Sequence, residues 1–156
     1  MNVRYRYIAA LVVAIGLLFL CGCTTTPGAF PRDYGSRVAE KVWLTLDAVD
    51  TMQTVQIARN PSCFREADPF AARLYGSEHP DASRVVLTNV VLALVHSSVS
   101  RWFDDGYARA EAREDGNPGP WAVGRIAWHA VSIVGTGAAV ANNFSRGIGP
   151  TSARCP

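Results

Sequence analysis

Three long segments of the chain repeat their apolar residues at three- and four-residue spacing, and each carries its polar side chains in one narrow row. Residues at this spacing fall on one face of a helix. The rows are Asp47, Asp50, Thr51 and Thr54, then Asn89, His96 and Ser100, then Arg125, His129 and Ser132. No segment shows the two-residue alternation of a strand. The pattern therefore predicts an all-α fold.

Start and stop residues delimit these segments. The sequence predicts long helices over residues 36–59, 83–103 and 121–144, with Ser36 and Ser83 as N-caps of the first two. Asn60-Pro61 ends the first, and Asp104-Asp105-Gly106 is expected to interrupt the second and leave a separate short helical stretch after it. Another short helical piece is expected around residues 70–75. The expected architecture is a small bundle of three long helices plus short helical pieces, after an N-terminal signal helix.

The N-terminus has the order of a secretory signal. Arg4 and Arg6 precede the uncharged apolar run IAALVVAIGLLFL, residues 8–20. A positive region followed by an apolar core of this length is typical of a signal peptide. As a helix the run would be about 20 Å long, shorter than the roughly 30 Å hydrocarbon core, so a spanning anchor is the weaker interpretation.

The stretch Leu20-Cys21-Gly22-Cys23 resembles the lipobox of bacterial lipoproteins. The resemblance implies cleavage after Gly22 and acylation of Cys23, so that covalent lipid on Cys23 is the only cofactor expected. The alternative is an ordinary signal peptide in which the cysteine occurs by chance. The predicted organisation is a signal peptide at 1–22, a lipidated Thr/Pro/Gly-rich tether at 23–35 and a single helical domain at 36–156.

Charge excludes one class of partner. Cleavage would leave 134 residues (156 − 22), the size of one domain, and would remove two of the 15 basic residues, leaving 13 against 13 acidic ones. No basic run or stripe is present, so nucleic acid is not expected as a partner.

Two cysteines, Cys63 and Cys155, remain in the mature chain. In an oxidising compartment such a pair favours a disulfide, which here would tie the C-terminal tail to the loop after the first long helix. Two unpaired thiols are the alternative.

The second and third long helices are apolar nearly all round, which fits either the centre of a compact core or a bilayer. Polar residues interrupt both, and an outer-membrane lipoprotein should not carry spanning helices. We therefore expect a compact bundle facing the periplasm, with insertion in the inner membrane as the alternative. Thr24 follows the lipobox cysteine, which favours the outer membrane over the inner one.

The three polar rows are expected to meet, because an unpaired charge in apolar surroundings is costly. In this seam Asp47 or Asp50 would pair with Arg125, and His96 and His129 would form hydrogen bonds. One interpretation is a satisfied network that fixes helix register. The other is a site where His96, His129 and Asp50 bind a metal or small ligand, but no two histidines have the spacing that pre-arranges metal ligands, so no metal is predicted.

Residues 46–76, LDAVDTMQTVQIARNPSCFREADPFAARLYG, are similar to a pattern in small helical proteins of proteobacteria and their phages. In those proteins a helix with Asp, Thr and Gln precedes a proline and a Glu-x-Asn/Asp-Pro segment, which is Glu66 to Pro69 here. Two apolar helices follow, the first often with a central histidine, here His96. The resemblance implies the helical architecture and no activity.

No catalytic motif is present; the serines at 97, 98 and 100 lack the Gly-x-Ser-x-Gly context of a nucleophile. We expect a non-enzymatic, lipid-anchored envelope protein with a structural or interaction role, including a phage or prophage setting. Its expected partners are the membrane, through the lipid, and an envelope protein or a second copy. The alternatives are a small-ligand or metal-binding protein that uses the seam, and an inner-membrane helical protein.

Overall fold

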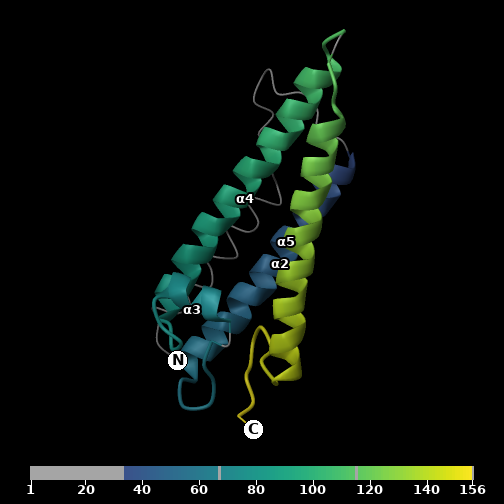
Figure 1. Ribbon diagram of the computed structural model, residues 1–156. Coiled ribbons are helices and arrows are strands. Elements are labelled where there is room, and N and C mark those ends of the chain that lie inside the picture. The colour runs from purple at the N-terminus through teal and green to yellow at the C-terminus, as the bar shows by residue number, and fades with distance from the viewer. Residues whose placement is uncertain (1–33, 67, 115, 156) are drawn as a thin grey trace.

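The computed structural model describes residues 34–66, 68–114 and 116–155 (Figure 1). Over these residues the chain forms the helices α2 (Tyr34–Arg59), α3 (Pro69–Tyr75), α4 (Ala82–Glu111) and α5 (Gly119–Ser145). Outside the helices, the described residues form one isolated β-bridge, between Ile148 and Ala153 in the C-terminal tail. The predicted all-α class is confirmed. The expected signal peptide, Cys23 and nearly all of the tether lie outside the described residues.

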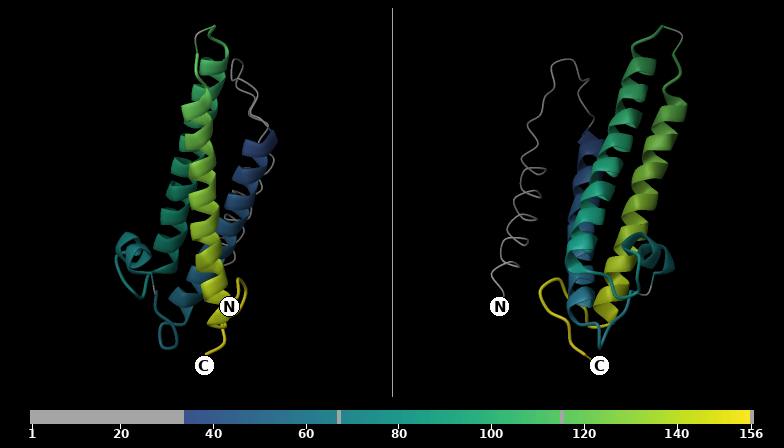
Figure 2. Two further views of the ribbon diagram at one scale, coloured as in Figure 1. Left: turned by 45° about the vertical axis from the view of Figure 1, so that its right-hand side comes forward. Right: turned by 90° about the vertical axis from the view of Figure 1, so that its left-hand side faces the viewer.

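The helices α2, α4 and α5 lie side by side along most of their length, and each contacts the other two (Figures 1 and 2). α4 runs antiparallel to α2 and α5, which run in the same direction. The connection between α4 and α5 therefore lies at the end where α2 begins. We call this the hairpin end. The C-terminal tail and α3 lie at the opposite end, which we call the disulfide end.

Three polar contacts set the register between the parallel helices α2 and α5. Each joins residues 93 positions apart, and successive contacts are seven residues apart, the repeat at which two helices keep the same faces together. The pairs are Ser36 Oγ with His129 Nε2 (3.4 Å), Trp43 Nε1 donating to Thr136 Oγ1 (3.1 Å), and Asn143 Nδ2 donating to Asp50 Oδ1 (3.2 Å).

α4 is one continuous helix, so the expected interruption at Asp104-Asp105-Gly106 is wrong. Tertiary contacts explain the difference. The Asp104 side chain is buried in an ion pair with Arg125 of α5. Gly106 gives room for the Trp121 ring, which a Cβ at this position would approach within 2.2 Å. Residues that favour a turn in isolation are thus used here for helix packing.

Both predicted N-caps are also displaced. α4 is capped by Asp81, whose carboxylate accepts hydrogen bonds from the backbone N–H of Ser83 and of Arg84 at 2.9 and 3.3 Å. The Ser83 hydroxyl also donates to this carboxylate and so lowers the pKa of Asp81. α2 begins at Tyr34, which leaves Ser36 inside the helix, where it is buried.

At the disulfide end the tail folds back onto α2. Cys63 and Cys155 form a disulfide with a Cα–Cα distance of 5.4 Å, so the pairing predicted from the cysteine count is present in the structure. Beside it Ile57, Phe64 and Ile148 form a small apolar cluster. Gln53 Nε2 donates to the Ile148 carbonyl at 2.9 Å and fixes the tail against α2.

The packing at Gly106 predicts a difference between two glycine variants. Gly106→Ala should destabilise the fold by about 1–3 kcal/mol, because its Cβ meets the Trp121 ring. Gly135→Ala is the matched control, since nothing lies within 4 Å of its added Cβ, and it should be neutral or stabilising by up to about 1 kcal/mol. Denaturant unfolding followed by circular dichroism measures both. Equal effects would show that Trp121 does not pack on Gly106.

Candidate functional site

The candidate site is the seam between the three long helices, because polar side chains dominate the interior there. Among the described residues 13 buried side chains are polar or charged and seven are hydrophobic. Many large apolar side chains on the same helices are exposed, including Leu87, Val131 and Val134. The usual distribution is therefore inverted along much of the bundle.

Toward the hairpin end, the seam is centred on Asp104. Arg125 Nη1 lies 3.4 Å from Asp104 Oδ1, and Ser36 Oγ donates to Asp104 Oδ2 at 3.1 Å. The Arg125 guanidinium also lies 4.8 Å from the centroid of the Tyr107 ring, a cation–π geometry. The expected pairing of Asp47 or Asp50 with Arg125 is wrong, because Arg125 faces the C-terminal part of α4.

His96 lies in the middle of the seam among aromatic rings. Its imidazole stacks on Trp43 with 3.6 Å between centroids and lies 5.1 Å from Trp128. Only 3 % of the residue is exposed, and neither ring nitrogen has a hydrogen-bond partner among the described residues. The His129 ring is 5.9 Å away, so the two histidines are brought together as predicted. His129 forms the expected hydrogen bond within the seam, with Ser36, but the hydrogen bond expected of His96 is absent among the described residues.

Toward the disulfide end, a chain of hydrogen bonds links α3, α4 and α2. Tyr75 Oη donates to Asn89 Oδ1 at 3.1 Å, and Asn89 Nδ2 donates to Thr51 Oγ1 at 2.8 Å. Thr51 in turn donates to the Asp47 carbonyl at 2.7 Å. Burial raises the pKa of the Tyr75 hydroxyl. The network is fully bonded and locks α3 onto the long helices.

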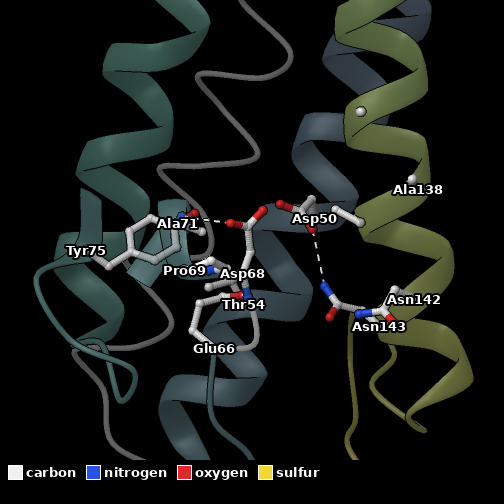
Figure 3. Close-up of a pocket in the computed structure, with 12 residues that line it drawn as sticks. Asp50, Thr54, Glu66, Asp68, Pro69, Ala71, Tyr75, Ala138, Asn142 and Asn143 are labelled. Atoms are coloured by element: carbon white, nitrogen blue, oxygen red, sulfur yellow. Dashed lines mark hydrogen bonds between the residues drawn. The ribbon is translucent and has the colours of Figure 1, made fainter. Parts of the chain in front are cut away.

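A pocket of about 450 Å³ opens between α2, α5 and the segment from Glu66 to Tyr75 (Figure 3). Three carboxylates line it, and each already accepts a hydrogen bond within the protein. Asp50 accepts from Asn143, Glu66 accepts from the Asp68 N–H, and Asp68 caps α3 by accepting from Phe70 and Ala71. These carboxylates therefore have structural roles.

The structure does not assemble the weak metal candidates. His96 and His129 are neighbours, but Asp50 lies in the pocket and is bonded to Asn143. Within the described parts of the chain, no group of three His, Cys, Asp or Glu side chains is placed to hold a metal ion. Asp47, the remaining predicted member of the seam, is half-buried on α2.

Comparison of the chain with protein-family models, curated proteins and solved structures finds no match. Two helices, α4 and α5, are long and apolar enough to cross a membrane, with mean hydropathy of 1.4 and 1.2 over their most apolar windows. Only 28 % and 11 % of those windows are buried within the protein. Neither helix is therefore the enclosed core helix expected of a compact bundle.

Several members of the seam were missed in the sequence. Trp43, Trp128 and Tyr75 supply its ring contacts and hydroxyl bond, and they are not part of the polar rows. The pattern that could have revealed the α2–α5 contacts is the seven-residue spacing shared by residues 36, 43 and 50 and by residues 129, 136 and 143.

Two buried polar residues of α4 give opposite predictions. Asn89→Leu should cost about 1–3 kcal/mol, because Tyr75 and Thr51 would lose a buried partner. His96→Phe should be neutral or stabilising by up to about 1 kcal/mol, since the ring still stacks on Trp43 and two unpaired nitrogens are removed. Chemical unfolding measures both variants. A larger loss in His96→Phe than in Asn89→Leu would show that the His96 nitrogens have a stabilising partner. Stoichiometric metal in the wild type that this variant lacks would show that His96 binds a ligand.

Proposed function

We propose that the protein is a non-enzymatic, membrane-anchored protein of the bacterial cell envelope, acting through contacts made by the apolar outer faces of its helices. The observation that carries the proposal is the inverted distribution of side chains: many polar side chains are buried between the helices, whereas large apolar side chains are exposed. A contiguous exposed apolar surface of this kind marks an interaction with a membrane or a partner protein.

The seam supports a structural role over catalysis. Asp104, Arg125 and Ser36 bond to one another in the interior, with 6 % and 14 % of the first two side chains exposed. A general acid or base needs access to a substrate as well as a suitable proton affinity. In the open pocket, Asp68 already caps α3 and Asp50 already accepts a hydrogen bond from Asn143 of α5. The arrangement thus fits a polar network that specifies how three long helices pack into a bundle.

The anchoring part of the proposal rests on the sequence. The lipobox resemblance makes Cys23 the lipidated residue, with the signal peptide before it and the tether after it. In this proposal the protein faces the periplasm, with the outer membrane favoured, and its partners are the bilayer and either an envelope protein or a second copy. The Cys63–Cys155 disulfide fits an oxidising compartment.

Metabolic labelling with radioactive palmitate tests the anchor. The wild type should incorporate label and sediment with membranes, whereas Cys23→Ala should lose all label because the acylated thiol is gone. Cys21→Ala is the matched control, since it changes the neighbouring cysteine and should keep the label. Label retained in Cys23→Ala, or an unlabelled wild type, would remove lipidation from the proposal.

A further inference from the structure

The exposed apolar side chains form a band around the three long helices. Between Arg84 and Arg101, α4 carries no charged residue, and its outward residues include Leu87, Val91 and Val95, which are half or more exposed. On α5 the outward residues of the band include Val131 and Val134, which are 73 % and 70 % exposed, and on α2 they include Val42 and Met52.

Exposed basic residues border this band at both ends. The antiparallel contacts of α2 with α4, Trp43 on His96 and Thr51 with Asn89, bring Lys41 and Arg59 to within about one helical turn of the levels of Arg101 and Arg84. The stretch from Arg84 to Arg101 rises about 26 Å, and that from Lys41 to Arg59 about 27 Å, at 1.5 Å per residue. These lengths approach the roughly 30 Å of a hydrocarbon core, and long basic side chains at its edges reach the headgroups.

Between Lys41 and Arg59, none of the charged residues of α2 is exposed. Asp47 and Asp50 of α2 are half-buried, and Asp50 faces the pocket at the disulfide end. Trp102 and Trp121 pack on each other just beyond Arg101, at the level where tryptophan is enriched in membrane proteins. The last turn of α4 and the connection after it are rich in charge, with Arg109, Glu111, Arg113 and Glu114 exposed.

We infer that the hydrocarbon of a lipid bilayer covers this band, so that α2, α4 and α5 cross the membrane together. A partner protein or a second copy would cover one side of the bundle, whereas exposed apolar side chains occur on all three long helices, and basic residues border them on α2 and α4. The basic borders complement anionic lipid headgroups. Inside a bilayer the buried hydrogen bonds of the seam are the expected way to satisfy polar groups. The inference rests on the proposed envelope location but places the bundle in the inner membrane instead of the outer one, because the spanning proteins of the outer membrane are closed barrels. It does not require lipid on Cys23.

If the three helices cross a membrane, lipidation of Cys23 and formation of the Cys63–Cys155 disulfide depend on each other. α2 begins at the hairpin end, eleven positions after Cys23 (34 − 23), and the Cys63–Cys155 pair lies at the disulfide end, across the membrane. A lipobox cysteine is acylated on the periplasmic side, so in a lipidated molecule Cys63 and Cys155 would face the reducing cytoplasm as thiols. Conversely, a disulfide formed in the periplasm implies that Cys23 is not lipidated. With three crossings, only one of these two modifications occurs in a given molecule.

Nitroxide accessibility in vesicles of phosphatidylethanolamine and phosphatidylglycerol tests the inference. Single cysteines replace Leu87, Val91, Val131 and Val134 one at a time in the full chain, each an exposed residue whose exchange leaves the interior intact. Exposed positions beyond each border, Ser77 and Ala112, are the matched aqueous controls. The spectrum of the chain without an added cysteine is subtracted.

Labels in the band should collide with oxygen several-fold more often, and with the water-soluble nickel complex Ni(II)-EDDA several-fold less often, than labels at the two controls. High nickel accessibility in the band would overturn the inference, because the band would then lie in water. Low accessibility to both reagents would also overturn it, because protein would then cover the band.

Palmitate label and an oxidised Cys63–Cys155 pair in the same molecules would exclude three crossings. The palmitate result alone tests the proposed lipid anchor, and the nitroxide accessibilities alone test insertion of the helices. Failure of one proposal can therefore be distinguished from failure of the other.

Discussion

The parallel contact between α2 and α5 determines the rest of the structure. Its three polar contacts repeat every seven residues along both helices, so they hold one face of α2 against one face of α5 over about four turns. A shift of one residue would rotate each face by about 100° and leave His129, Thr136 and Asn143 without their partners. Once this register is set, α4 can only lie antiparallel along the groove, where Asn89, His96 and Asp104 meet residues of the other helices.

A polar interior of this kind contributes more to specificity than to stability. A buried hydrogen bond contributes little net free energy to folding, but a buried polar group without its partner costs about 1–3 kcal/mol. Alternative registers, which would leave such groups unpaired, are therefore strongly disfavoured. Asp104 illustrates this, since it bonds to Arg125 and Ser36 from two different helices. His96 and Ser97 are exceptions. The His96 ring is held by stacking, and neither its nitrogens nor Ser97 Oγ has a hydrogen-bond partner among the described residues.

Sequence patterns predicted the class of fold and the location of the long helices because periodicity reports which residues share a helical face. They also indicated that the polar rows face one another. They did not predict which residues pair, since this depends on register: Arg125 meets Asp104, and Asp50 meets Asn143. Local rules also failed at Asp104 and Gly106, where packing against α5 outweighs their preference for a turn. Ser36 was expected to cap a helix and is instead part of the buried seam.

The surface and the interior of the bundle have one physical explanation when the band lies in hydrocarbon. Exposing apolar side chains to water costs free energy, but exposing them to hydrocarbon does not. The inward polar groups then form the hydrogen bonds between helices that lipid cannot provide. The pocket lined by Asp50, Glu66 and Asp68 would then be the route by which water reaches the seam, because charged groups inside a membrane persist only beside water or a partner. The side of the bundle where α3 lines that pocket beside α2 and α5 is thus the part where polar chemistry and solvent meet.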